Sequence, residues 1–193
     1  MKKLGKIIFN FILIALFLII FSDTSSATVT VGKRFSLKMA GSDDIEYSVA
    51  YVITSLDPAE VMLDDCENDF VGDFVIPSQV TYEDVDYTVT GLGDYNGFWL
   101  CDDITTITIP ETIRYIENES KVPFQSNSLT AINVNSKNQY FMSEDGVLYN
   151  IDKTELIRYP ENKSDLTSYT IPSSVSLITV SYTHLTLPTM AVV

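Results

Sequence analysis

Histidine and cysteine are almost missing from this sequence. The only histidine among 193 residues is His184, and the only cysteines are Cys66 and Cys101. A Ser-His-Asp or Cys-His catalytic arrangement needs a histidine base, and two cysteines alone cannot complete a four-cysteine zinc site. The eight glycines form no loop of the kind that holds the phosphates of a nucleotide. We therefore expect no metal, no cofactor and no enzymatic activity in the residues present.

Basic residues are also scarce. The chain has 12 Lys and Arg against 26 Asp and Glu, which gives a net charge of −14. Such a chain repels phosphate backbones, so we expect no nucleic-acid partner. The acidic residues are scattered in pairs, which is typical of a solvated surface, and none has the context of a glycoside hydrolase site. The acidic run 64–69 lacks the glycine and closing glutamate of an EF-hand loop, so we interpret it as a turn rather than a calcium site.

A long apolar run occurs only near the N-terminus. Three lysines precede the run Ile7–Phe21, and the small residues Ser25, Ser26 and Ala27 follow it. This order predicts a secretory signal peptide over residues 1–27. The run is shorter than the roughly 20 residues of a membrane-spanning helix, and an uncleaved signal anchor is the alternative. We expect an exported protein, secreted or on the cell surface, with no membrane insertion after signal cleavage.

The C-terminal end has an unusual sequence. Residues 181–189, Ser-Tyr-Thr-His-Leu-Thr-Leu-Pro-Thr, resemble the translation of a sequencing adapter rather than of a gene. We therefore expect residues 180–193 to be a non-native tail and the chain to be a C-terminally truncated fragment. A natural, slightly apolar tail is the alternative. The single histidine falls inside this stretch.

Amphipathic helical patterns are missing after the signal peptide. The composition is instead rich in residues that favour strands, with 11 tyrosines and 10 phenylalanines. Residues 45–53 alternate apolar and polar side chains and predict a strand, and shorter alternating runs lie on either side. We assign residues 28–71 to an N-terminal β segment that caps the rest of the chain.

From residue 74 onwards the sequence repeats itself. The block Phe-Val-Ile-Pro at 74–77 returns as Ile-Thr-Ile-Pro at 107–110 and as Tyr-Thr-Ile-Pro at 169–172, with a weaker copy, Ile-Asn-Val, at 132–134. Each block predicts a short strand ended by proline, which has no N–H for a ladder. Such repetition is typical of a solenoid, in which each coil buries its apolar face against the next. We expect Ile107, Ile132 and Ile171 to stack on one another.

One stretch of the repeats carries a specific motif. Phe98-x-x-Cys101-x-x-Ile104-x-x-Ile107-x-Ile109-Pro110-x-x-Ile113 resembles the BspA-like leucine-rich repeats of bacterial surface proteins. Residues 129–160 resemble a variant of that family in which a hairpin enlarges one coil, and Asp145-Gly146 is a strong hairpin turn signal. The sequence departs from the pattern at Asn127, where a cysteine is usual, and in the short spacing from 124 to 129.

The resemblance implies a β-rich leucine-rich-repeat solenoid. Its coils are right-handed, with short stacked strands and few or no regular helices. The repeats would cover residues 72–179, with the hairpin insert at about 138–160. The expected repeat core comprises Ile76, Val80, Phe98, Cys101, Ile104, Ile107, Ile109, Ile113, Phe124, Leu129, Ile132, Val134, Ile171 and Val175.

The resemblance also implies a function in binding. We expect adhesion to an extracellular or host protein, to matrix proteins or to other cells. The alternatives are a structural spacer that presents a lost C-terminal domain and a carbohydrate-binding module. Trp99, Tyr140 and Tyr149 are candidate contact residues, but for the two tyrosines, which belong to the hairpin insert, packing across the hairpin is the favoured interpretation. Cys66 and Cys101 either pair as a disulfide in an oxidising compartment or remain two separate buried thiols.

Overall fold

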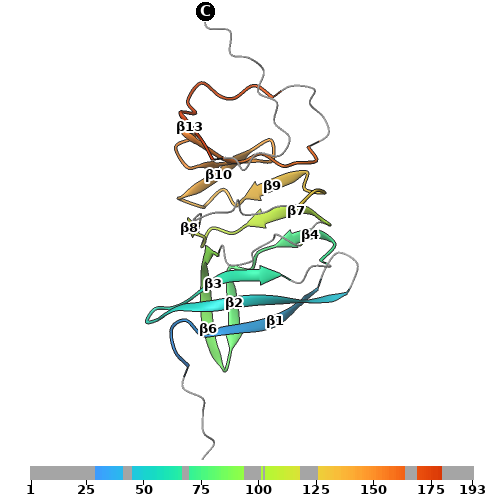
Figure 1. The fold of residues 1–193 in the computed structure, drawn as a ribbon. Coiled ribbons are helices and arrows are strands. Elements are labelled where there is room, and N and C mark those ends of the chain that lie inside the picture. Colours follow the sequence, from blue (N-terminus) through green and yellow to red (C-terminus); the bar gives the residue numbers. More distant parts are fainter. Residues whose placement is uncertain are drawn as a thin grey trace, which may run out of the picture.

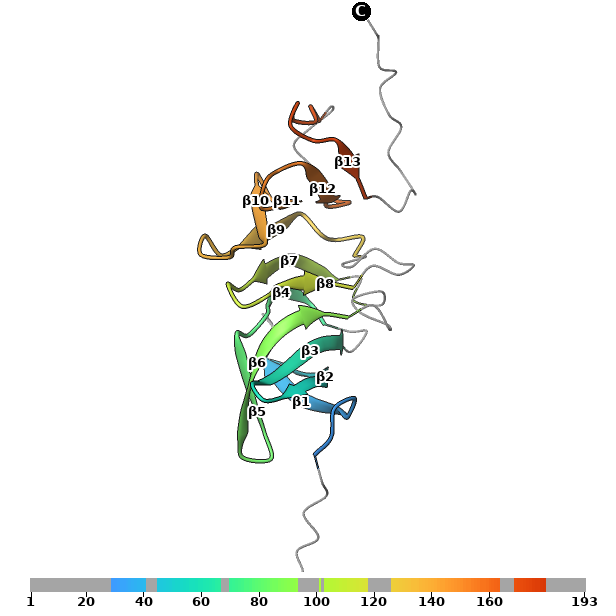
Figure 2. The ribbon, with the colours of Figure 1, turned by 90° about the vertical axis from the view of Figure 1, so that its left-hand side faces the viewer.

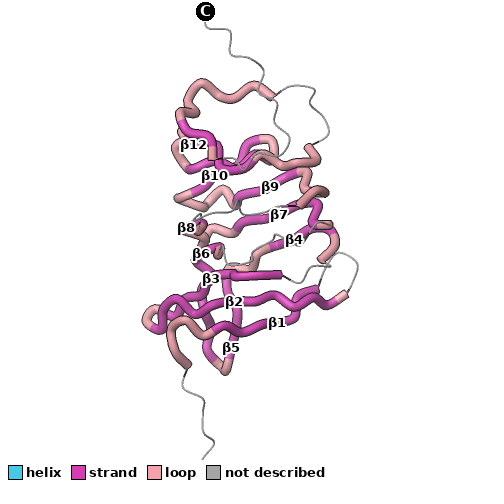
Figure 3. The backbone as a smooth tube through the Cα atoms, viewed as in Figure 1, coloured by secondary structure: helices cyan, strands magenta, loops and turns pink. Residues whose placement is uncertain are grey.

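The computed structural model describes residues 29–40, 45–66, 70–93, 101, 103–117, 126–163 and 169–179. These residues form strands, turns and loops, and the described part of the chain contains no helix (Figure 3). None of it is therefore a helix long and apolar enough to cross a membrane. The expected signal peptide and C-terminal tail lie outside the described residues, as do Phe98, Trp99 and Phe124.

The N-terminal strands form one six-stranded sheet. Its members are β1 (Arg34–Ala40), β2 (Glu46–Leu56), β3 (Ala59–Cys66), β5 (Gln79–Tyr82), β6 (Val85–Leu92) and β8 (Tyr115–Ile116). β1, β2 and β3 are antiparallel neighbours, and β2 covers all of the strand predicted over residues 45–53 except Ile45. β5 and β6 form a hairpin, and β6 lies parallel to β3 (Figure 2). This sheet therefore extends beyond residue 71, where we expected the N-terminal segment to end, because β6 belongs to the first repeat.

A second sheet contains three of the four repeated blocks, because residues 169–172, expected as a strand, form none. β4 (Gly72–Val75), β7 (Ile104–Ile109) and β9 (Ala131–Val134) lie in parallel, one above the other (Figure 1). Phe74 pairs with Ile107, and Ile107 pairs with Ile132, so equivalent positions of the blocks are in register. β3, β6 and β8 form another parallel series. From β6 to β9 the chain therefore alternates between two parallel ladders, adding one strand to each in turn.

The third sheet is the hairpin insert and the segment after it. Its strands are β10 (Phe141–Glu144), β11 (Val147–Asn150), β12 (Glu155–Arg158) and β13 (Leu177–Ile178), in that order. Asp145 and Gly146, with φ of 50° and 76°, make the two-residue turn between β10 and β11. β11 then pairs with β12, and Tyr149 lies opposite Leu156. The turn at Asp145-Gly146 lies where the sequence predicts it.

The main core combines the N-terminal segment with the repeats. Among the expected repeat-core residues, the side chains buried in it are Ile76, Cys101, Ile104, Ile107, Ile109, Ile113, Leu129 and Ile132, while Val80 and Val134 pack against it half-buried. A separate small core inside the insert contains Val147, Tyr149 and Leu156. Val175 packs against this second core rather than against the repeat core.

The expected stacking of Ile171 on Ile132 is wrong. Ile171 is 37% exposed. The element next to β9 on the side away from β7 is the hairpin of β10 and β11. The N–H of Ile132 donates to the carbonyl of Gly146 at 2.9 Å, so the insert occupies the position where the next repeat would stack. Residues 169–179 consequently lie one layer further along, where the N–H of Ser176 donates to the carbonyl of Thr154. The insert separates the last block from the other three.

The two cysteines are joined. Cys66 at the end of β3 and Cys101 shortly before β7 form a disulfide, with 6.9 Å between their Cα atoms. Both residues are buried in the main core. The bond therefore ties the N-terminal sheet to the second repeat across 35 residues of chain. Of the two alternatives that the sequence left open, the structure has the disulfide.

Candidate functional site

The first candidate surface is the outer side of the β4–β7–β9 ladder. Two rows of side chains cross it in register, and every member is exposed or half-buried. One row is Asp73, Thr106 and Ala131, and the other is Val75, Thr108 and Asn133. We call these six residues the ladder face. Its side chains are short, so the surface is flat along the direction in which the repeats stack.

The ladder face is ordered by its own polar contacts. The carboxylate of Asp73 accepts hydrogen bonds from the hydroxyls of Thr105 at 3.0 Å and Thr106 at 2.7 Å. The hydroxyl of Thr130 donates to the carbonyl of Thr105 at 2.9 Å, which links the next layer. These bonds hold exposed side chains in fixed positions, which lowers the entropy that a partner must overcome on binding.

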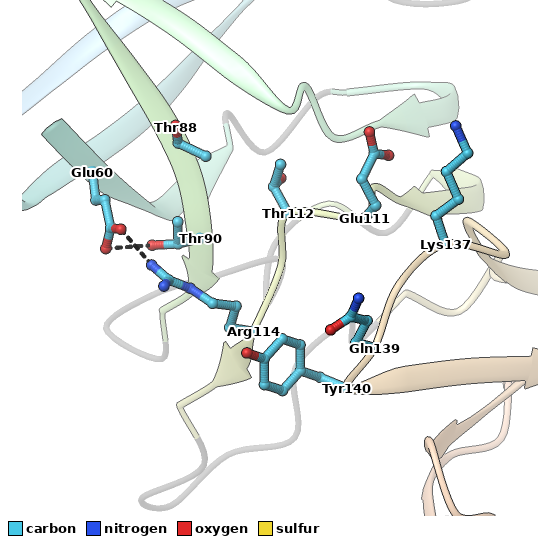
Figure 4. Close-up of a pocket in the computed structure, with 9 residues that line it drawn as sticks. All are labelled: Glu60, Thr88, Thr90, Glu111, Thr112, Arg114, Lys137, Gln139 and Tyr140. Atoms are coloured by element: carbon cyan, nitrogen blue, oxygen red, sulfur yellow. Dashed lines mark hydrogen bonds and ion pairs between the residues drawn. The ribbon is translucent and has the colours of Figure 1, made fainter. Parts of the chain in front are cut away.

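The second candidate surface is a groove of about 360 Å³ beside the β6 and β8 strands (Figure 4). Its lining comes from three successive layers: β3 and β6, the segment between β7 and β8, and the segment between β9 and β10. The residues are Glu60, Thr88, Thr90, Glu111, Thr112, Arg114, Lys137, Gln139 and Tyr140. We call it the threonine groove. In the view of Figure 4, Glu60 and Lys137 lie at opposite ends.

An ion pair fixes one end of the threonine groove. The Arg114 guanidinium donates to the carboxylate of Glu60, with 2.5 Å between Nη2 and Oε1. The hydroxyl of Thr90 lies 3.5 Å from the other carboxylate oxygen of Glu60. The backbone N–H of Arg114 donates to the carbonyl of Thr90 at 2.8 Å, so the arginine is anchored at both its backbone and its side chain. Half of the Arg114 side chain nevertheless remains open to solvent, within reach of a ligand.

Asn138 fixes the other side of the groove. Its side chain is buried, at 4% exposure, and its amide N–H groups donate to the carbonyls of Pro110 and Ile113 at 2.9 and 3.0 Å. Its amide oxygen accepts from the backbone N–H groups of Tyr140 and Phe141, both at 2.8 Å. All four hydrogen-bonding positions of this amide are therefore used. The segment that carries Tyr140 is thereby bound to the turn of the preceding layer.

The three candidate contact residues have different outcomes. Tyr140 lines the threonine groove and is 46% exposed. Tyr149 is completely buried in the core of the insert, so its assignment as a partner contact is wrong. Burial raises its pKa far above the usual value for tyrosine, which keeps the phenol protonated in the folded state. Val175, which lies just before β13, packs against the cluster that contains Tyr149. The alternation of side chains along β11 could not reveal this contact with a distant segment. Trp99 lies outside the described residues.

Sequence reasoning missed most of the groove. Glu60, Arg114 and Gln139 are 25 or more residues apart in the sequence. The turns that contribute to the lining have no sequence pattern of their own. Tyr115 was also missed, although it is 36% exposed. Its ring lies over Gly91, where an added Cβ would be 2.2 Å from the ring carbon Cζ. The signal in the sequence is the glycine itself. It can be recognised only when Gly91 and Tyr115 are known to pair in neighbouring parallel strands.

The described residues contain no group of three or more His, Cys, Asp or Glu placed to hold a metal ion. The acidic run 64–69 is only partly described. Within it, the carboxylates of Asp64 and Asp65 form ion pairs with Arg34 at 2.5 and 3.1 Å. Arg34 thus connects β1 to the end of β3, and these two carboxylates are engaged in holding the sheet.

No protein-family model matches the chain, and no curated protein matches it. Among solved structures, the chain is similar to a leucine-rich repeat protein from Eubacterium ventriosum, with 29% identity and a TM-score of 0.44 over 55% of this chain. It is also similar to a leucine-rich cell surface protein from Faecalibacterium prausnitzii, with 17% identity and a TM-score of 0.36 over 53% of this chain. The pneumococcal vaccine antigen PcpA matches 78% of this chain and 61% of its own, with 17% identity and a TM-score of 0.26.

The chain spans about a quarter of the length of the first two of these proteins, at 25% and 24%. Both are described as leucine-rich, and the second as a cell surface protein.

Proposed function

We propose that this chain belongs to an exported, cell-surface or secreted leucine-rich-repeat protein of the BspA-like type. Its stacked coils form a short solenoid that binds another macromolecule. The expected role is adhesion to a host or matrix protein, or to other cells. The family pattern at residues 98–113 and the alternation of the chain between two parallel ladders support this proposal.

Export is supported by two independent features. The first 27 residues have the composition of a signal peptide. The disulfide between Cys66 and Cys101 is of the kind that forms and persists outside the reducing cytosol. The high negative charge keeps such a protein in solution and away from anionic membrane surfaces.

The ladder face carries the proposal for a protein partner. It presents two rows of short side chains in register, with Val75 exposed and the other members polar or small. A flat surface without long flexible side chains can approach a partner closely and loses little side-chain entropy on binding. Stacked repeats extend the surface by one strand per coil, which suits an extended contact.

The test is binding of the purified chain to a panel of immobilised extracellular-matrix proteins. We expect saturable binding to at least one of them, and loss of that binding in Thr108→Arg, which places a long charged side chain in the centre of the ladder face. Ser36→Arg is the matched control, because it makes the same change at an exposed position of β1 in the other sheet. Binding that survives Thr108→Arg would contradict the assignment of the face, and a silent panel would favour the structural spacer.

A further inference from the structure

We propose that the threonine groove is a separate binding site for a neutral saccharide unit of an extracellular glycan. The groove lies on other elements than the ladder face, namely β3, β6 and the turns that follow β7 and β9. This inference therefore stands or falls independently of the protein-binding surface proposed above.

The charge of the lining points to an uncharged ligand. Two carboxylates, Glu60 and Glu111, are balanced by two cations, Arg114 and Lys137, in a chain whose net charge is −14. An anionic ligand would meet the two carboxylates, and a cationic one would meet the arginine and the lysine. A neutral polar ligand avoids both repulsions and can use all four groups as hydrogen-bonding partners.

The polar groups of the lining match those of a sugar. A sugar hydroxyl both donates and accepts, and the groove offers both functions. Arg114 and Lys137 donate only, the two glutamates accept only, and the threonines and Gln139 do both. No aliphatic Val, Leu or Ile is among the described residues that line the groove, which argues against the apolar anchor of a peptide. The volume of about 360 Å³ lies at the small end of the range for ligand sites.

Tyr140 supplies the apolar platform that a pyranose needs. Its side chain is 46% exposed and lies along the edge of the groove (Figure 4). The face of an aromatic ring carries negative potential and attracts the polarised C–H bonds on the flat side of a sugar ring. The phenol hydroxyl of Tyr140 has no hydrogen-bond partner among the described residues and can contact a neighbouring hydroxyl of the same ligand.

The site is organised before any ligand arrives. Asn138 joins the Tyr140 segment to the preceding turn through four hydrogen bonds, two to each, and Glu60 holds Arg114 in an ion pair. Asn135 likewise donates to the carboxylate of Glu111 at 2.8 Å. Side chains held in place in the free protein cost less entropy when a ligand binds.

The experiment uses the purified chain on an array of neutral, sialylated and sulfated oligosaccharides. We expect retention on neutral members, followed by calorimetry with the neutral oligosaccharide retained most strongly. Tyr140→Ser should weaken that binding roughly tenfold or more, since the stacking platform is lost. Gln139→Ala, at an exposed position without a packing role, should weaken it severalfold.

Tyr115→Ser is the matched control, because Tyr115 is an exposed tyrosine next to Arg114 that does not line the groove. It should leave the affinity within about twofold, and melting temperatures show that each variant is folded. Retention of no oligosaccharide, retention of charged members alone, or equal losses in Tyr140→Ser and Tyr115→Ser would each overturn the proposal. Thr108→Arg separates the two sites: it should abolish matrix-protein binding and leave saccharide binding unchanged.

Discussion

At the scale of single residues, Asn138 is a buried polar side chain that joins two layers. Its side chain satisfies two carbonyls of one turn and two N–H groups of the next. An apolar replacement leaves these backbone groups without their partner in a buried place. The cost of such a change is the desolvation of several polar groups rather than the loss of one contact.

Asn138→Ala should therefore lower the free energy of unfolding by about 2–4 kcal/mol. Urea denaturation measures the change. Asn135→Ala is the control, since Asn135 is exposed and should cost less than about 1 kcal/mol. Equal stability of the two variants would mean that the clamp contributes nothing beyond a surface hydrogen bond.

Tyr51 gives the protein a defined response to alkaline pH. Its ring is buried, and burial raises its pKa well above the usual value for tyrosine, near 10. Between that value and the raised pKa of the folded state, the unfolded chain releases the phenol proton and the folded chain keeps it. The stability linked to Tyr51 is therefore fully present below about pH 10 and is lost as the pH rises further.

Tyr51→Phe should flatten the fall in stability above about pH 10, because phenylalanine has no proton to release. The measurement is the urea midpoint between pH 8 and 11.5 for both proteins. The hydroxyl's only described partner interaction is a long one to the sulfur of Met39 at 3.8 Å, so the variant should fold normally at neutral pH. The same alkaline slope in both proteins would contradict this origin of the pH dependence.

At the scale of elements, the hairpin insert depends on its turn. Gly146 has a φ of 76°, and a Cβ added to it would lie 2.8 Å from the Cβ of Ala131 on β9. Glycine is therefore needed at this position for two reasons. It tolerates the positive φ, and it lets the insert approach β9 closely.

Gly146→Ala should reduce the free energy of unfolding by about 1–3 kcal/mol. Adding Ala131→Gly should restore the part due to the steric contact, while the part due to the positive φ remains. Asp145→Asn, which keeps a favourable turn residue, should be close to neutral. Denaturant unfolding distinguishes the four proteins, and a neutral Gly146→Ala would show that the turn rearranges freely.

At the scale of the whole molecule, the disulfide joins the two parts that the sequence treats as separate. Cys66 belongs to the N-terminal sheet, and Cys101 lies at the start of the second layer of repeats. Together with the parallel pairing of β3 and β6, the bond makes the N-terminal sheet the first layer of the stack. Buried apolar residues of the N-terminal sheet and of the repeats accordingly share one core.

The double variant Cys66→Ser/Cys101→Ser should lose roughly 4 kcal/mol of stability, because the unfolded chain regains the freedom of a 35-residue loop. Dithiothreitol should lower the melting temperature of the parent protein towards that of the variant. The variant itself should not respond to the reductant. A parent protein whose melting temperature ignores the reductant would contradict a stabilising role for the bond.

The sequence by itself determined the local features. Alternation with period two placed β2 and three of the four repeated blocks, although the fourth, residues 169–172, forms no strand. Prolines follow β4 and β7, and Asp145-Gly146 specified the hairpin turn. These features depend only on neighbours along the chain, namely on φ, on side-chain alternation and on the missing N–H of proline.

Only the tertiary structure decided which layers lie next to one another and which residues they bring together. It placed the insert between Ile132 and Ile171, buried Tyr149, joined the two cysteines and assembled the threonine groove from four separate segments. The repeated blocks share one sequence pattern, so the pattern does not show which of them packs against β9. Tertiary packing decides this: the hairpin lies against β9, with the N–H of Ile132 bonded to the carbonyl of Gly146, and the next block lies beyond the hairpin.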